Sequence, residues 1–121
     1  QREKRQLQTI FDHAPYGIIF AEGPTTLYVN PMFTEITGYT LTDIPTGDEW
    51  ALKAYPDPHY REKVIKAFQE VIHQKKTGFE IIFEVVCKNG DVKKIRFRPT
   101  FLEDRKAILM ISEILDDLGI S

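Results

Sequence analysis

Histidine and cysteine are the residue types in this chain that could most readily bind a metal or react, and they are few. His59 and His73 fall in one stretch of helical periodicity, where a neutral imidazole could ligate iron. His59, the better placed of the two, lies in a predicted first turn, where polar side chains usually face solvent, and His73 directly follows the apolar Ile72. Cys87 is the only cysteine, so it has neither a disulfide partner nor the companions that a zinc site needs.

A catalytic centre would need a nucleophile, a base and an orienting group that the fold could bring together. Apart from the terminal residue, Ser112 is the only serine, and no Ser/His/Asp or Cys/His arrangement can be assembled around it. Glu80 and Glu84 alternate along a stretch of strand character, which is typical of a solvated strand face. Because a glycine-rich phosphate loop is also absent from the sequence, we predict a domain that is not itself an enzyme.

Arginine side chains are the remaining candidates for contact with a ligand. Arg96 and Arg98 alternate with Ile95 and Phe97, so only one of these two sets can face the interior of a sheet. An inward arginine would select a carboxylate or a phosphate through a bidentate contact. An inward apolar set would form core and is the more typical arrangement, but both alternatives stay open at this point.

Length and composition indicate one domain. The 121 residues suffice for a single core, and 42% hydrophobic and 28% charged residues are typical of a globular protein. A net charge of −2 gives no electrostatic reason to expect a nucleic-acid partner. The sequence has neither a membrane-spanning apolar run nor a signal peptide, so we expect a cytoplasmic domain without membrane contact. The first residue is Gln rather than Met, which suggests a piece excised from a longer chain.

The N-terminal half alternates helix and strand signals. Residues 1–13 have amphipathic helical periodicity, with apolar positions at i, i+3 and i+4. Residues 17–21 and 26–29 have the character of two strands joined by a Gly-Pro turn. A helix is predicted to follow over residues 30–38, capped by Asn30 and started by the proline after it.

The C-terminal half contains one long helix and three strands. Short helical turns are expected near residues 41–44 and 49–54, followed by a helix from residue 58 to about residue 76. Asn89-Gly90 predicts a two-residue hairpin turn in which both residues have positive φ. The three predicted strands are residues 79–88, 92–101 and 106–114. The complete order predicts an α+β fold: a five-stranded antiparallel sheet with helices between the second and third strands.

This order of elements, together with particular residues, resembles the PAS family over nearly the whole chain. Residues 10–19 are similar to the helix that leads into the first strand of the family. Residues 28–39, which begin Tyr28-Val29-Asn30-Pro31, match the best-known PAS signature. Residues 78–98 are similar to the third and fourth strands. The resemblance implies an N-terminal helix at 1–14, a PAS domain at 15–115 and a linker beginning at 116–121.

The resemblance also implies a signalling context. Residues 48–61 are similar to a bacterial PAS subgroup found in multidomain sensor histidine kinases and diguanylate cyclases. We therefore expect a covalently linked output domain of one of these two-component or cyclase types. PAS domains commonly end in an Asp-Ile-Thr triplet that couples the sheet to the output. Glu113, Ile114 and Leu115 occupy that place here, so the acid and the isoleucine are kept and the hydroxyl is lost.

Cofactors are tested by the same comparison. Light-sensing PAS relatives carry a reactive cysteine in a loop helix, whereas this chain has no cysteine between Gly38 and Phe79. Covalent flavin chemistry is therefore not expected. Haem-binding relatives place an axial histidine on the long helix, where His59 and His73 occur. Because both histidines are expected to point away from the interior, haem binding is not expected. The identity of any ligand stays unknown.

Two functional hypotheses follow from these observations. The first is a sensory domain that binds a small molecule or a partner in the cavity of the PAS fold and relays the signal. The second is a ligand-free scaffold that forms a homodimer through its N-terminal helix. The candidate pocket residues are Ile19, Ala21, Asn30, Phe33, Tyr55, His59, Phe68 and Arg96. The candidate coupling residues are Glu113 and Ile114, and the candidate dimerisation residues are Leu7, Ile10 and Phe11.

Overall fold

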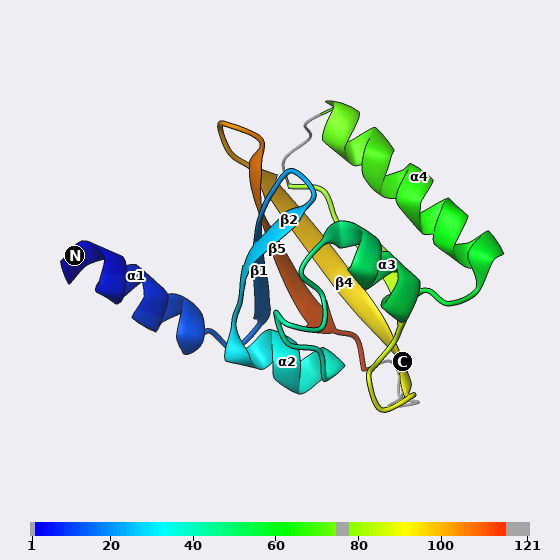
Figure 1. The fold of residues 1–121 in the computed structure, drawn as a ribbon, viewed down its shortest axis with the longest axis horizontal. Helices are drawn as coiled ribbons and strands as arrows, with labels where there is room; N and C mark the ends of the chain where they lie inside the picture. The colour runs from blue at the N-terminus through cyan, green and yellow to red at the C-terminus, as the bar shows by residue number, and fades with distance from the viewer. Residues whose placement is uncertain (1, 75–77, 116–121) are drawn as a thin grey trace.

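The computed structural model of the chain describes residues 2–74 and 78–115 and contains one five-stranded sheet with helices (Figure 1). The elements in chain order are α1 (Arg2–Asp12), β1 (Gly17–Glu22), β2 (Thr25–Val29), α2 (Pro31–Thr37), α3 (Gly47–Ala54), α4 (Pro58–Gln74), β3 (Ile81–Val86), β4 (Val92–Phe101) and β5 (Lys106–Glu113). Helices α2, α3 and α4 lie between the second and third strands, which confirms the predicted α+β architecture.

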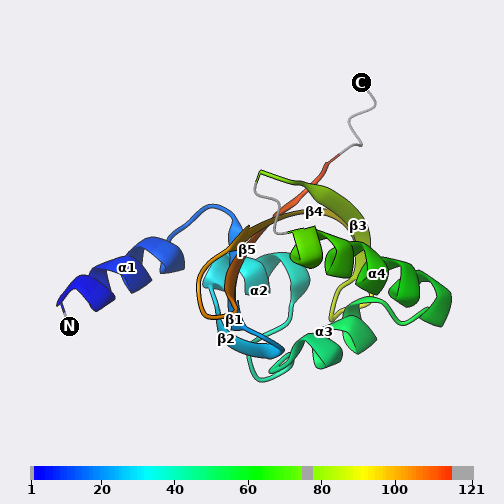
Figure 2. The same cartoon turned by 90° about the horizontal axis from the view of Figure 1, so that it is seen from above.

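The sheet is antiparallel throughout and has the order β2-β1-β5-β4-β3. The first and last strands in sequence are therefore neighbours, with Gly17 opposite Ile111 and Glu22 opposite Lys106. Helices α2, α3 and α4 lie on one face of the curved sheet, whereas α1 projects to the side (Figure 2). The core must therefore lie between the sheet and these three helices.

Strand β4 shows which residues face that core. Ile95 and Phe97 are fully buried, whereas Arg96 is half-exposed and Arg98 is exposed on the other face. Of the two alternatives for this strand, the apolar set is the inner one, because side chains alternate between the faces of a sheet. The buried core residues are Ile19, Phe33, Tyr39, Ile44, Ala54, Tyr55, Val64, Val85, Ile95, Phe97 and Ile111.

Local signals explain both ends of α2. The Asn30 side chain accepts a hydrogen bond of 3.0 Å from the amide of Phe33, and proline occupies the first turn, as predicted. Gly38 ends the helix with φ of 83°, and its amide donates to the carbonyl of Thr34. A side chain at Gly38 would also approach Lys88, since an added Cβ would lie 3.0 Å from the Lys88 Cβ.

The hairpin turns differ from the prediction. At the β3–β4 turn only Gly90 has positive φ, and its amide donates to the carbonyl of Cys87, so the predicted two-residue turn with positive φ at Asn89 is wrong. The left-handed pair is found at the β4–β5 turn instead, where Asp104 has φ of 61° and Arg105 has φ of 63°. Asp104 tolerates this conformation, whereas the pairing of β4 with β5 imposes it on Arg105, which does not favour it.

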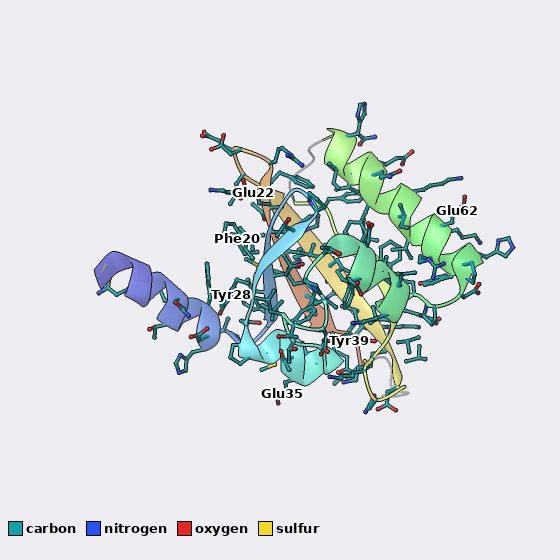
Figure 3. All side chains as sticks on the ribbon, viewed as in Figure 1. Phe20, Glu22, Tyr28, Glu35, Tyr39 and Glu62 are labelled. Carbon is teal, nitrogen blue, oxygen red and sulfur yellow. The ribbon has the colours of Figure 1, made fainter. Side chains whose placement is uncertain are left out.

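Helix α4 covers one end of the sheet. Val64 and Val71 are buried, whereas Ile65 and Ile72 are 40% and 52% exposed, so its buried stripe is narrow. Glu62 points away from the sheet (Figure 3). Residues 75 and 76, over which this helix was expected to continue, lie outside the described residues. Within residues 2–74 and 78–115, no helix combines the length and the apolar character needed to span a bilayer.

Candidate functional site

The side chain of Asn30 makes hydrogen bonds to three segments of the chain. Its amide nitrogen donates to the carbonyls of Phe11 at 2.8 Å and Tyr16 at 3.0 Å. Its side-chain oxygen accepts from the amides of Ile18 at 2.8 Å and Phe33 at 3.0 Å. Asn30 was predicted as a pocket residue, but these bonds already use its polar atoms. It is instead the residue that joins the end of α1, the start of β1 and the start of α2.

Tyr55 is the largest fully buried side chain of the core. It ends α3, where its amide donates to the carbonyl of Ala51 at 3.0 Å. Its own carbonyl accepts a hydrogen bond of 3.1 Å from the Arg61 guanidinium. Pro56 follows, and a residue before proline is pushed out of the helical conformation. The backbone is therefore held on both sides, and the phenol projects into the core between α3 and α4.

Aromatic rings surround Tyr55. Its ring centroid lies 5.9 Å from that of Trp50, 6.1 Å from that of Tyr60 and 6.2 Å from that of Phe83, all in edge arrangements. Further ring contacts extend from this group in both directions, to Phe33, Tyr39, Phe68 and Phe97. A continuous aromatic cluster therefore connects α2, α3 and α4 with the inner face of β3 and β4.

The hydroxyl of Tyr55 is the unusual polar atom of this cluster. It is buried and meets no partner within hydrogen-bonding geometry among the residues that the structure describes. Burial also raises the pKa of Tyr55 well above its usual range, although the nearby Trp50 side chain lowers this pKa in part, so the phenol keeps its proton. In contrast, the Tyr39 hydroxyl donates to the carbonyl of Val86 at 2.8 Å, and the Tyr60 hydroxyl accepts from the amide of Glu84 at 2.8 Å. A buried unpaired hydroxyl is rare in native proteins and calls for a partner.

Three of the predicted pocket residues lie together in the core and a fourth packs against it. Ile19, Phe33 and Tyr55 belong to the buried cluster, and Phe68 is partly buried against that cluster. Ala21 faces the same side of the sheet but is only half-buried, and it lies beside the bulge at Leu27 of β2. The first four residues therefore share the core, whereas Ala21 lies at its margin.

His59 and Arg96 were also predicted in the pocket, and the structure contradicts both predictions. His59 is exposed in the first turn of α4, where its backbone amide donates to the Asp57 carboxylate. Arg96 lies on the outer face of the sheet with its Nε 3.3 Å from a carboxylate oxygen of Glu80, which also pairs with Arg98. The physical reasons are the solvated first turn of the helix and the alternation of β4.

Cys87 is buried, whereas the two histidines of α4 are exposed. Cys87 is buried directly after β3, its sulfur lies 3.6 Å from the carbonyl oxygen of Ile36, and burial raises the pKa of its thiol. His73 is exposed on α4, as His59 is. Among residues 2–74 and 78–115, no three His, Cys, Asp or Glu side chains are grouped so as to hold a metal ion.

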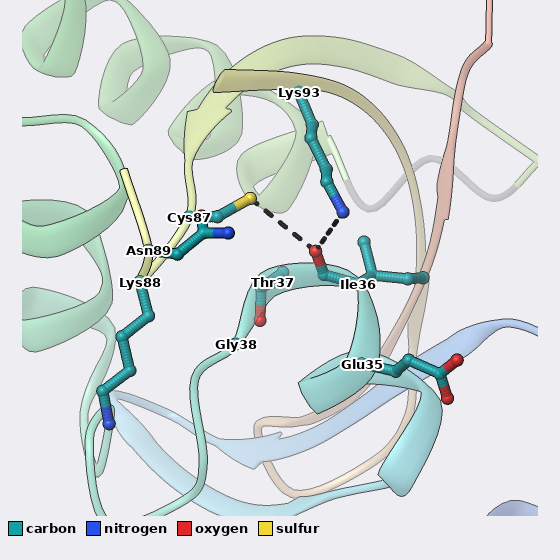
Figure 4. A pocket seen from close by; sticks show the side chains of 8 residues that line it. All are labelled: Glu35, Ile36, Thr37, Gly38, Cys87, Lys88, Asn89 and Lys93. Atoms are coloured by element: carbon teal, nitrogen blue, oxygen red, sulfur yellow. Dashed lines mark hydrogen bonds between the residues drawn. The ribbon is translucent and has the colours of Figure 1, made fainter. Parts of the chain in front are cut away.

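The predicted coupling residues lie where β5 ends. A Glu113 carboxylate oxygen is 3.5 Å from the Lys93 ammonium, and the Ile114 amide donates to the carbonyl of Lys94 at 2.9 Å. The Lys93 ammonium also donates to the carbonyl of Ile36 at 2.9 Å, in the last turn of α2 (Figure 4). Sequence reasoning missed Lys93. Its alternation with Ile95 on β4 was the available signal, because both residues project to the inner face.

Two surface pockets adjoin Lys93. One has a volume of about 280 Å³ and lies between the end of α2 and the β3–β4 turn (Figure 4). The other has a volume of about 320 Å³ and lies where the chain leaves β5. The lining residues of the first are Glu35, Ile36, Thr37, Gly38, Cys87, Lys88, Asn89 and Lys93. Lys93 lines both pockets.

Helix α1 is attached to the sheet through its last turn. The rings of Phe11 and Tyr28 are 6.1 Å apart, and the Tyr28 hydroxyl donates to the Asp12 carboxylate at 2.5 Å. Burial and this hydrogen bond raise the pKa of Tyr28. Ile10, a predicted dimerisation residue, is 62% exposed, whereas Phe11 is half-buried. The side chain of Leu7, the third such residue, lies outside the described set.

Comparisons with known proteins agree with this geometry. A family model described as PAS fold matches residues 26–112, which is more than half of the chain. The chain belongs to the PAS fold family, whose members are sensory domains. This result confirms the resemblance seen in the sequence. The comparison with curated proteins found no match.

Solved structures share the fold at low sequence identity. A domain of a sensory box sensor histidine kinase/response regulator from Geobacter sulfurreducens is 20% identical, with a TM-score of 0.72 over 90% of this chain and 92% of that one. The N-terminal domain of a diguanylate cyclase with PAS/PAC sensor from Marinobacter aquaeolei is 14% identical, with a TM-score of 0.67 over 80% and 94% of the two chains.

A third structure is that of the PAS domain, in complex with ethanol, of a transcriptional regulator in the LuxR family from Burkholderia thailandensis. It is 12% identical to this chain, with a TM-score of 0.71 over 88% of this chain and 96% of that one. Identities this low carry the fold alone.

Proposed function

We propose that the domain is the sensory part of a longer signalling protein and that it detects a compact, neutral molecule at the Tyr55 hydroxyl. The observation that carries this proposal is the buried phenol without a partner. Leaving such a group unpaired costs about 1–3 kcal/mol, so an acceptor atom from a ligand would gain this amount over an already paired site. Neutrality follows from the apolar rings around it, since a buried charge would need a counter-charge.

The size of the ligand follows from the same rings. The ring of Tyr55 is in contact with three other rings, those of Trp50, Tyr60 and Phe83, at centroid distances of 5.9–6.2 Å. A molecule of a few heavy atoms could displace these side chains slightly, whereas a flavin or a haem would require the aromatic cluster to open. The ethanol complex of the LuxR-family PAS domain is a precedent for a ligand of this size in the same fold.

The output of the proposed sensor is the end of β5. Glu113 and Ile114 are the last described positions that bond to β4, through Lys93 and Lys94. A ligand that binds one state of the interior more tightly would shift the population of states at this end of the sheet. We propose a histidine kinase or diguanylate cyclase as the linked output domain, as in the two sensor proteins compared above.

Native mass spectrometry of the purified domain, with an absorbance spectrum beside it, is the first test. We expect an added mass of a small molecule, no visible absorbance, and a rise in melting temperature when ethanol or acetone is added at millimolar concentration. Tyr55→Phe should abolish that rise, whereas Tyr39→Phe should keep it, because the Tyr39 hydroxyl is already bonded to Val86. An unchanged thermal shift in Tyr55→Phe would contradict a ligand at the hydroxyl.

The ligand-free scaffold is the second candidate, and the continuity of the aromatic cluster favours it. Rings in contact from Phe33 through Trp50, Tyr55 and Phe83 to Phe97 can fill the interior by themselves. In this case the purified protein would have its bare mass and would respond to no small molecule.

Dimerisation would then be the function of the domain, and the exposed Ile10 on α1 would contribute to the interface. We expect Ile10→Ser, alone or with Leu7→Ser, to convert a dimer into a monomer in analytical ultracentrifugation. Because Ile10 is exposed, the fold should be unaffected. A dimer of unchanged affinity in both variants would contradict an interface on α1.

A further inference from the structure

We propose that Lys93 is a positioning residue that makes the end of β5 respond to the position of α2. The proposal rests on the relay part of the function proposed above and names the side chain through which the relay passes. Lys93 lies at the start of β4, and its ammonium lies between two acceptors from different elements. One is the backbone carbonyl of Ile36 in α2, and the other is the carboxylate of Glu113 at the end of β5.

The two distances show that one ammonium group makes two unequal contacts. The Lys93 Nζ is 2.9 Å from the Ile36 carbonyl oxygen and 3.5 Å from the nearer Glu113 oxygen. The carbonyl at the end of a helix attracts a cation, and so does the carboxylate. A shift of α2 that lengthens the first contact would therefore release the ammonium toward Glu113. The side chains of Lys93 and Glu113 are 26% and 31% exposed, so solvent screens this pair only in part.

Two neighbouring residues of β4, Lys93 and Lys94, contact the last residue of β5 and the residue that follows it. The Lys93 side chain pairs with Glu113, and the Lys94 carbonyl accepts the amide of Ile114 at 2.9 Å. The backbone bond gives an observable reporter, because the exchange of the Ile114 amide with solvent measures how often this end opens. A change in the Lys93–Glu113 contact should therefore change the exchange rate of the Ile114 amide, one residue further along the chain.

On its other side, α2 is in contact with the interior. Phe33, in its first turn, has its ring centroid 5.7 Å from that of Trp50, and Trp50 is 5.9 Å from Tyr55. Asn30 also caps α2 and bonds to the backbone of β1. A displacement at Tyr55 would thus move Ile36 through the short helix α2. Lys93 would transmit this movement to β5, because its ammonium contacts both Ile36 and Glu113.

The test perturbs α2 and observes Ile114 with and without the Lys93 ammonium. Thr37→Val removes a hydrogen bond of 2.9 Å to the carbonyl of Phe33 and one of 3.2 Å from the amide of Tyr39. In the domain with Lys93, we expect Thr37→Val to change the exchange rate of the Ile114 amide by roughly two- to thirtyfold, the range that such couplings span. In a Lys93→Met background the change should vanish, and in Lys93→Arg it should return.

The control is Lys66→Met, which removes a charge from an exposed position on α4 and should leave the response of Ile114 intact. If Lys93→Met fails to fold, Glu113→Gln replaces it, because this variant keeps the bond to Ile36 and removes only the charge of the partner. An equal response in Lys93→Met and in the parent would overturn the role of Lys93 and leave the relay standing. No response in either would overturn the relay as well. Neither result depends on a ligand at Tyr55.

Discussion

The hydroxyl of Tyr39 donates a hydrogen bond of 2.8 Å to the carbonyl of Val86 and so joins the segment after α2 to the end of β3. Tyr55 is as deeply buried, with 2% exposure against 5%, yet its hydroxyl has no partner within the described residues. Two buried tyrosines of one core therefore differ in whether the hydroxyl is hydrogen-bonded. This difference allows the unpaired hydroxyl to be tested against a paired one.

Replacing each tyrosine with phenylalanine should change stability in opposite directions. In the ligand-free domain, Tyr55→Phe should raise the free energy of unfolding by about 1 kcal/mol, because it removes a desolvated group that makes no bond. Tyr39→Phe should lower it by about 1–2 kcal/mol, because the Val86 carbonyl loses a donor. Urea denaturation at pH 7 measures both values. A loss of stability in Tyr55→Phe would show that a bound molecule or water pairs the hydroxyl in solution.

Asn30→Ala should be among the most destabilising substitutions in the chain. The variant loses two bonds from the side-chain nitrogen and two to the oxygen, and it leaves buried backbone groups of Ile18 and Phe33 without partners. We expect a loss of about 3 kcal/mol or more in urea denaturation. Asn89→Ala is the matched control, since Asn89 is exposed in a turn and should cost less than about 1 kcal/mol. Equal losses in both variants would contradict the role of Asn30.

Asp43 should contribute to the acid sensitivity of the domain. The amide of Thr40, followed by the ammonium of Lys88, lowers the pKa of Asp43 below its ordinary value of 3.8. Because the folded pKa is the lower one, this group stabilises the fold above about pH 4 and loses that contribution as the pH falls through the folded value. Asp43→Asn should therefore be less stable than the parent at pH 7 and lose less stability on acidification.

Thermal unfolding between pH 7 and pH 2.5 measures this effect. Glu62→Gln serves as the control, because Glu62 is exposed and points away from the sheet (Figure 3). The control should follow the pH profile of the parent. A parallel profile for Asp43→Asn would mean that the contacts with Thr40 and Lys88 do not persist in solution.

The two hairpin turns should respond in opposite ways to glycine substitutions. Arg105 has φ of 63°, a conformation that costs most residues about 1 kcal/mol, so Arg105→Gly should stabilise the domain by about that amount. Gly90 has φ of 97°, so Gly90→Ala should destabilise it by at least about 1 kcal/mol. Denaturant midpoints report both changes. Stabilisation by Gly90→Ala would contradict the turn geometry described here.

Local chemistry made several features predictable. An asparagine before a proline caps α2 because its side chain reaches the next amides without help from the rest of the fold, and Gly38 ends the helix because it tolerates positive φ. The alternation along β4 limited its inner face to two alternatives, and periodicity and turn signals gave the order of elements. Each of these signals acts over a few residues, which is why the sequence alone contained them.

The candidate site depends on contacts between residues distant in sequence, and only some of the pocket residues predicted from the sequence lie in the core. Ile19, Phe33, Tyr55 and Phe68 lie in or against the core as apolar residues of regular elements should. The prediction that Arg96 lies in the pocket was wrong, because Ile95 and Phe97 are the side chains of β4 that are buried and Arg96 alternates with them.

By itself, then, the sequence determined the helix caps, the strand pattern and the PAS class, since these follow from bonding and steric preferences along the chain. Only the tertiary structure decided that the Tyr55 hydroxyl is left unpaired, that Lys93 stands between α2 and Glu113, and that Arg105 adopts positive φ. Ile36, Phe83 and Gly23, which contact Lys93, Tyr55 and Arg105 respectively, lie far from them along the chain and become adjacent only in the folded domain.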